Sequence, residues 1–257
     1  MKLFRVWLLL ALLLLVCGCA STQTTSTDGG QSREIGTRAL SAVLVQDALD
    51  REAQFTIAGG LKPVSSGFWQ GKIDLASPSV DELTRIRRGL EPLRSGDLYA
   101  DVQVFATADD GERYLDAYVV HRPSLAQMIE RTQPFWARYG IAPDTHPAEL
   151  LAVVDRMPRL DRFRGYGLLF GYPEEAIDFF VDAAAEEEQT GEFVERRFMQ
   201  IPTFDSPTGQ FTYAVPIKHR ETEADRRLRE RAGEILSRYR QLRDPARPLK
   251  TLEAMTR

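Results

Sequence analysis

Apolar and polar residues alternate from Leu98 to Val119, which is the pattern of strands with one buried face. The sequence Asp109-Asp110-Gly111 interrupts the alternation with residues that favour a tight turn. The apolar side consists of Val102, Val104, Ala106, Leu115, Ala117 and Val119. The segment therefore predicts a β-hairpin. A second hairpin is predicted for residues 197–204 and 210–218, around a turn at 205–209.

Apolar residues at helical spacing predict helices elsewhere in the chain. The expected helices cover residues 37–52, 79–89, 124–136, 145–157, 173–190 and 222–242. Ser124 and Thr222 each precede an amide or acidic residue three positions later, which is typical of a capping box. The short apolar run Phe55-Thr56-Ile57-Ala58 predicts a strand.

Two antiparallel hairpins among five or six helices indicate an α+β fold. Because an isolated two-stranded hairpin is marginal in water, we expect both hairpins to join one antiparallel sheet. The helix residues expected to cover it are Phe135, Trp136, Ile177 and Phe180. Each hairpin is followed by a His-Arg dipeptide, one further residue and a Ser or Thr that caps the next helix. A duplicated unit or shared capping chemistry would explain this, and we favour the second.

The N-terminus has the pattern of a secretory signal peptide. Lys2 and Arg5 precede an apolar run from Val6 to Val16 that contains no polar residue. Even extended to Ala20, this run is shorter than the roughly 20 apolar residues that cross a membrane. An uncleaved membrane anchor is therefore the weaker interpretation.

The run closes with Val16-Cys17-Gly18-Cys19-Ala20-Ser21, which resembles the lipobox of bacterial lipoproteins. The resemblance implies that residues 1–18 are removed and that Cys19 then carries a diacylglyceryl thioether, usually with a third acyl chain on its amine. Two or three acyl chains anchor a protein stably. The absence of Asp directly after the cysteine implies an outer membrane, with the protein facing the periplasm.

Residues 19–35 are expected to form a flexible tether, because residues 21–32 contain no apolar side chain larger than Ala. The remaining residues, 36–257, are then expected to form a single α+β domain. Both cysteines, Cys17 and Cys19, lie in the signal region, so this domain has no disulfide and no thiol.

The charge balance argues against a nucleic-acid partner. Of 33 basic residues, Lys2 and Arg5 leave with the signal, so 31 face 37 acidic residues and the formal charge falls from −4 to −6. The run Glu186-Glu187-Glu188 is expected to be a solvated helix end. No cofactor or metal motif is present, and we predict neither.

The segment Gly59–Trp69 combines glycines with candidate ligand-binding side chains: Lys62 offers a charge, Ser65 and Ser66 hydroxyls, and Trp69 a stacking surface. It matches neither a P-loop nor the nucleophile elbow of hydrolases. A tight turn with Lys62 solvated and Trp69 in the core is the favoured alternative.

Histidines supply two further ligand-binding candidates. His121 and His219 each follow a hairpin, and they approach each other only if the hairpins share a sheet. Neither they nor His146 stand at a zinc spacing. A Ser-His-Asp site can be drawn from these histidines, Ser65 or Ser66, and Asp101 or Asp116, although nothing selects that set.

The polar side of the first hairpin is a third candidate. It contains Tyr99, Asp101, Gln103, Phe105, Tyr114, Asp116 and Tyr118. Alternating aromatic and acidic side chains can line a ligand groove. More often a helix covers such a face, and this is the interpretation we favour.

These observations predict a membrane-anchored envelope lipoprotein with a non-catalytic binding or structural domain, whose partner is an envelope protein or a small ligand. The alternative is an envelope hydrolase with a Ser/His/Asp-type site. A hydrogen bond between Ser65 or Ser66 and a histidine, with a carboxylate behind it, would favour the hydrolase.

Overall fold

The structure, a computed structural model, describes residues 31–257, with side chains from Gly36 onward. The predicted signal peptide and Cys19 lie outside the described residues, as does most of the predicted tether. Residues Glu34–Arg257 form one compact unit. Its first helix, α2 (Gln31–Asp50), begins within the stretch expected to be tether.

The first predicted hairpin is confirmed. Strands β2 (Leu98–Asp109) and β3 (Glu112–His121) pair antiparallel around Asp110 and Gly111. Both turn residues have positive φ, 50° and 77°, as a two-residue turn that matches the strand twist requires.

A strand that the sequence did not predict completes this sheet. Residues Val64–Asp74 form β1, which pairs antiparallel with β3 and gives the order β1-β3-β2. The glycine-rich segment Gly59–Trp69 is therefore not a loop throughout, because its second half is paired. Strand pairing between residues 38 to 56 positions apart leaves little trace in local sequence, since context overrides β-propensity.

The second hairpin forms as predicted, from β4 (Arg196–Ile201) and β5 (Phe211–Pro216), but in a separate two-stranded sheet. The expectation of one sheet is therefore wrong. The second hairpin instead buries its apolar face in a core that it shares with the three-stranded sheet, so it does not have to pair with that sheet to be stable. One hydrophobic cluster includes residues of both sheets, among them Ala100, Val102, Leu115, Val119, Phe211, Tyr213 and Val215.

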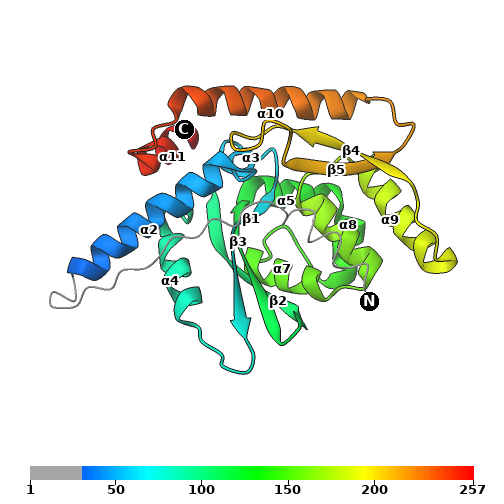
Figure 1. Cartoon of the computed structure of the whole chain (residues 1–257). Coiled ribbons are helices and arrows are strands. Elements are labelled where there is room, and N and C mark those ends of the chain that lie inside the picture. The colour runs from blue at the N-terminus through cyan, green and yellow to red at the C-terminus, as the bar shows by residue number, and fades with distance from the viewer. Residues whose placement is uncertain (1–30) are drawn as a thin grey trace. The chain divides into compact units, whose positions relative to one another are not determined.

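Helices cover both faces of the three-stranded sheet (Figure 1). On one side lie α2 and α4 (Asp81–Gly89), where Gly89 approaches the side chains of Leu40 and Leu44. On the other side lie α5 (Arg122–Arg131), α6 (Gln133–Trp136), α7 (Pro147–Arg156) and α8 (Arg159–Leu169).

The side of the sheet that these later helices cover differs from the prediction. Trp136 and Ile177 cluster with Val64, Tyr118 and Val120. They therefore contact the face expected to be polar, whereas Val102, Leu115 and Val119 belong to the other cluster. The sheet is thus buried on both faces, which alternation alone cannot show.

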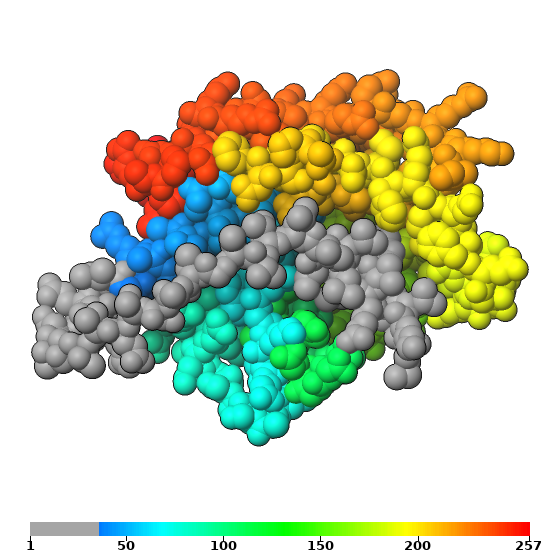
Figure 2. All heavy atoms as spheres, viewed as in Figure 1, coloured from blue at the N-terminus to red at the C-terminus, as the bar shows by residue number. Residues whose placement is uncertain are grey.

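The C-terminal part contributes α9 (Glu174–Thr190), α10 (Glu223–Leu242) and α11 (Pro248–Met255). The capping box predicted at Thr222 is confirmed, with Asp225 as its second member. Side chains of α10, orange in Figure 2, project outward from the surface. Among residues 31–257, no helix has the length and apolar character to cross a membrane.

The α+β class is confirmed, but residues 31–257 contain ten helices rather than five or six. The run at 55–58 is a wrong prediction, because Gln54–Ile57 form a short helix, α3. A four-residue apolar run does not distinguish the two states. Helix α8 escaped prediction because Gly165 and Gly167 break its pattern. They allow close packing, since a Cβ on Gly167 would lie 2.8 Å from Ile177 Cγ1.

Candidate functional site

Lys62 lies in the core and does not reach solvent. Its side chain is 2 % exposed and its ammonium forms an ion pair with Glu52. The ammonium lies over the rings of Phe211, at 4.3 Å, and Phe170, at 5.2 Å. Neither the ligand-binding role nor the solvated alternative fits, because the aromatic rings and Glu52 already surround the charge.

Ser65 and Trp69, two other candidates in this segment, also form internal contacts. The Ser65 hydroxyl is buried, 2.8 Å from the Thr56 hydroxyl, and donates to the Glu52 carbonyl oxygen at 3.3 Å. Ser66 lies in β1 opposite Tyr118. The ring of Trp69 packs over Gly71 at the margin of the core. Since Ser65 is buried in internal hydrogen bonds and Trp69 packs on its own strand, these side chains do not converge on a ligand site.

His121 caps a helix. Its Nδ1 lies 2.8 Å from the Ser124 hydroxyl and accepts from the Ser124 amide at 3.3 Å, so the cap of α5 is His121 rather than the predicted Ser124. Burial lowers the pKa of His121, which favours the neutral imidazole that can accept. Gly60 lies against this pair, because a Cβ there would be 2.4 Å from Nδ1.

His219 belongs to a separate buried network at the start of α10. Its Nε2 is 2.7 Å from Asp225, which also accepts from the hydroxyls of Tyr213 and Thr222 at 2.5 and 2.8 Å. Burial alone would raise the pKa of Asp225, but these hydrogen bonds outweigh it and hold that pKa at about 2. A site shared by His121 and His219 required both hairpins to lie in one sheet. They lie in different sheets, so that prediction is wrong.

The proposed Ser-His-Asp constellation is not assembled from the nominated residues. The hydroxyl beside His121 belongs to Ser124, and the same Nδ1 also receives the Ser124 amide. Asp101 is bound by Arg87 and Arg94, whereas Asp116 accepts from Gln70. Across residues 31–257, no three His, Cys, Asp or Glu side chains are placed to hold a metal ion.

The polar face of the first hairpin is covered by helices, as favoured from the sequence. Tyr118 is 2 % exposed, and the Gln103 amide donates to the Tyr166 hydroxyl of α8 at 2.9 Å. Burial raises the pKa of Asp116 on this face to about 7, although the hydrogen bond from Gln70 opposes the shift. The cover is incomplete, and a hollow remains on each side of α7.

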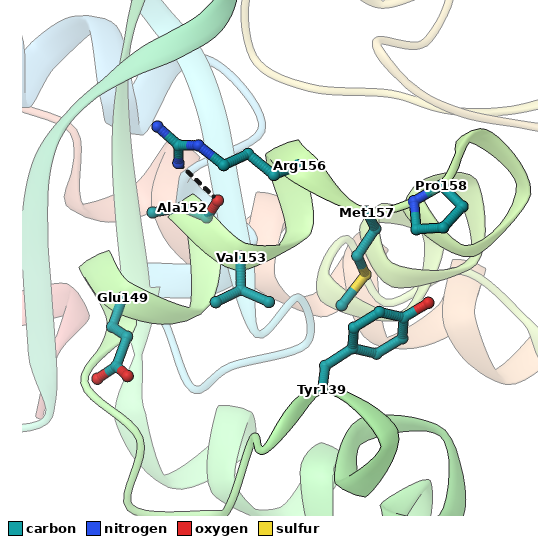
Figure 3. Close-up of a pocket in the computed structure, with 7 residues that line it drawn as sticks. All are labelled: Tyr139, Glu149, Ala152, Val153, Arg156, Met157 and Pro158. Carbon is teal, nitrogen blue, oxygen red and sulfur yellow. Dashed lines mark hydrogen bonds between the residues drawn. The ribbon is translucent and has the colours of Figure 1, made fainter.

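The first hollow, which we call the apolar hollow, has a volume of about 370 Å³ and is open to solvent (Figure 3). Its lining residues are Tyr139, Glu149, Ala152, Val153, Arg156, Met157 and Pro158. Figure 3 shows that Val153, Met157 and the Tyr139 ring point toward one another. Arg156 donates to the Ala152 carbonyl oxygen at 2.9 Å, so its guanidinium lies along the helix.

The second hollow, the polar hollow, has a volume of about 180 Å³ and lies between α4, β2 and α7. Its lining residues include Arg87, Asp101, Gln103, Tyr118, Ala148 and Leu151. Alternation in β2 and β3 identified Asp101, Gln103 and Tyr118. Arg87 and the α7 residues were missed because they come from helices distant in sequence. Ala152 lines both hollows, so α7 separates them.

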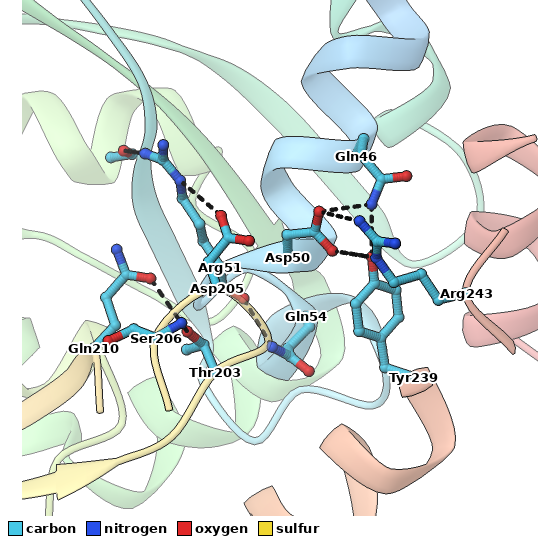
Figure 4. Close-up of polar contacts among 11 residues, drawn as sticks. Gln46, Asp50, Arg51, Gln54, Thr203, Asp205, Ser206, Gln210, Tyr239 and Arg243 are labelled. Carbon is cyan, nitrogen blue, oxygen red and sulfur yellow. Dashed lines mark hydrogen bonds and ion pairs between the residues drawn. The ribbon is translucent and has the colours of Figure 1, made fainter. Parts of the chain in front are cut away.

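A polar cluster joins α2 to α10 on the opposite side of the sheet (Figure 4). Arg243 donates to both oxygens of Asp50, at 2.8 and 2.9 Å, and the Tyr239 hydroxyl donates to Asp50 at 2.6 Å. Burial alone would raise the pKa of Asp50, but these donors outweigh it and lower it. The cluster is internally satisfied and fastens the two helices together.

Comparison with known protein families, curated proteins and solved structures finds no match to this chain.

Proposed function

We propose that this chain is a non-catalytic binding module of the cell envelope, and that its apolar hollow receives an apolar side chain of a second envelope protein. The observation that carries the proposal is the hollow itself. The polar residues nominated from the sequence form internal contacts, whereas the hollow presents unoccupied apolar surface on α7.

The dimensions and the rim favour a protein partner. A volume of 370 Å³ is near the lower end of the roughly 300–1,000 Å³ of small-molecule sites, so one or two side chains fill it. Glu149 and Arg156 give the rim charges of both signs, which suits a polypeptide with mixed polar groups around an apolar anchor. A lipid surface would favour a rim of positive charge.

The proposed location follows from the lipobox. Acyl chains on Cys19 would hold the domain at the outer membrane, facing the periplasm. A domain fixed at a membrane meets its partner at a high effective concentration, so a small contact suffices for binding. An interface centred on one shallow hollow is compatible with that arrangement.

Site-specific photo-crosslinking in cells tests the proposal. Benzoylphenylalanine replaces Glu149 at the rim of the apolar hollow, and in a control it replaces Arg227, which is 76 % exposed on α10. We expect irradiation to give one defined adduct with an envelope protein from position 149 only. Val153→Glu, which places a carboxylate in the hollow, is expected to abolish that adduct.

Two results would contradict the proposal. The first is the absence of an adduct from position 149 in cells that contain the folded, membrane-bound protein. Alternatively, the adduct would persist in Val153→Glu at its original yield, which would show that the hollow does not contribute to the contact.

A further inference from the structure

The polar hollow has a lining that is independent of the proposed protein partner. It lies on the other side of α7, and β2 supplies its polar wall. Ala148, Leu151 and Ala152 of α7 supply an apolar wall opposite. A hollow with one polar and one apolar wall suits a small amphipathic ligand.

The hydrogen-bonding groups in this hollow are unequally used. Asp101 accepts from Arg87 Nε at 2.7 Å, from the Val102 amide at 2.8 Å and from the Tyr99 hydroxyl at 3.4 Å, and Arg94 lies 3.5 Å away. Its carboxylate therefore has little capacity left for a ligand. The carboxylate fixes the orientation of the Arg87 guanidinium through Nε.

The donors, in contrast, have spare capacity. Arg87 contacts the described residues only through Nε, so both of its terminal amino groups are available, and its side chain is 44 % exposed. Gln103 uses one amide hydrogen for Tyr166 and retains the other. An excess of donors beside a saturated carboxylate selects a ligand that accepts hydrogen bonds. A carboxylate matches two parallel guanidinium N–H groups best.

The volume sets the size of the ligand. A dry cavity of about 150 Å³ in another protein accommodates benzene. At 180 Å³, the polar hollow has room for a ring of that size and a carboxylate, a total of about nine non-hydrogen atoms. We propose that the polar hollow is a binding site for a small aromatic or branched aliphatic carboxylate, held by the terminal amino groups of Arg87 with its apolar body against Leu151.

Benzoate is the probe that tests this site, and benzyl alcohol is its uncharged counterpart. The full-length protein is reconstituted in nanodiscs, and binding is measured by saturation-transfer NMR against empty nanodiscs. We expect benzoate to bind with a dissociation constant of about 1 mM, as for other ligands of this size. Benzyl alcohol is expected to bind at least about tenfold more weakly, because it lacks the charge-assisted contact.

Two variants locate the probe. Arg87→Gln is expected to raise the dissociation constant of benzoate at least about tenfold. Arg85→Gln is the matched control, because Arg85 lies on the same helix, is 65 % exposed and does not line the hollow. Its affinity should equal that of the unaltered protein. The melting temperature of each variant shows whether it is folded.

Any of three results would overturn the inference: no binding of benzoate at 10 times the expected dissociation constant, equal binding by Arg87→Gln, or equal binding of benzyl alcohol. The first would exclude a carboxylate site of this size. The second would place benzoate elsewhere, and the third would reduce the hollow to a non-selective apolar cavity.

Discussion

The ion pair between Lys62 and Glu52 has one buried and one partly exposed member, so removing Glu52 should destabilise the fold more than removing Lys62. Lys62 is 2 % exposed, whereas Glu52 is 22 % exposed. Glu52→Gln therefore leaves an ammonium in the core among aromatic rings, with no carboxylate to neutralise it. Lys62→Met leaves a carboxylate that water still reaches, and Met fills much of the space of the Lys chain.

The magnitudes follow from this difference in exposure. Removing one member of a buried ion pair costs about 3–5 kcal/mol when the remaining charge stays buried. We expect Glu52→Gln to lower the free energy of unfolding by about 3 kcal/mol, since the Gln oxygen still accepts one hydrogen bond. Lys62→Met is expected to lower it by only about 1 kcal/mol. The double variant should approach the unaltered protein, because no charge remains buried.

Urea unfolding followed by circular dichroism at pH 7 measures these differences. With a slope of about 3 kcal/mol/M, Glu52→Gln moves the midpoint down by about 1 M. Lys72→Met is the control, because Lys72 lies on the neighbouring strand β1, is 46 % exposed and pairs with Glu112 at the surface. Its midpoint should hardly move.

The reasoning would be refuted if Lys62→Met were as destabilising as Glu52→Gln. It would also fail if the effects of the two single changes simply added in the double variant. Equal costs would mean that the carboxylate left by Lys62→Met is no better solvated than the ammonium left by Glu52→Gln. Additive effects would mean that the aromatic rings, and not the carboxylate, balance the charge of Lys62.

Two further predictions concern the half-buried acids Asp116 and Glu187. Burial raises the pKa of Asp116 to about 7. The folded protein therefore keeps a proton that the unfolded chain releases between pH 4 and 7, and its stability declines across that window by up to about 4 kcal/mol. Asp116→Asn should remove the decline in urea titrations at successive pH values, and an unchanged decline would exclude Asp116 as its cause. Glu187→Ala should destabilise by about 3 kcal/mol, because Arg196, whose side chain is 4 % exposed, loses its ion pair. The matched change Glu188→Ala breaks a more exposed pair with Arg159 and should cost under about 1 kcal/mol, so equal effects would contradict the argument.

Local periodicity predicted the elements whose signals are local. The turn at Asp110-Gly111, the capping box at Thr222 and the helix that begins near Pro173 all form as expected, because each depends on residues within a few positions. The pairing of β1 with β3 joins residues 38 to 56 positions apart, and no local pattern indicates it.

The same limit explains the candidate site. The sequence predicted Lys62 to be ligand-binding or solvated. The rings that cover it, Phe170 and Phe211, lie more than 100 positions later in the chain, so no local pattern shows them. Glu187 was predicted to be solvated, because the helix pattern does not show that Arg196 of the next strand reaches it. The sequence identified only part of the lining of the polar hollow, since alternation indicated Asp101 and Gln103 but not the helices that complete it.

The proposed function depends on the envelope location, and the mass of the mature N-terminus tests that location most directly. Mass spectrometry of protein purified from membranes should find Cys19 as the first residue, carrying a diacylglyceryl group. In Cys19→Ala, the protein should leave the membrane fraction or remain as the full precursor. A cleaved, unacylated N-terminus on a variant that still fractionates with salt-washed membranes would contradict the account, because the domain itself would then bind the membrane.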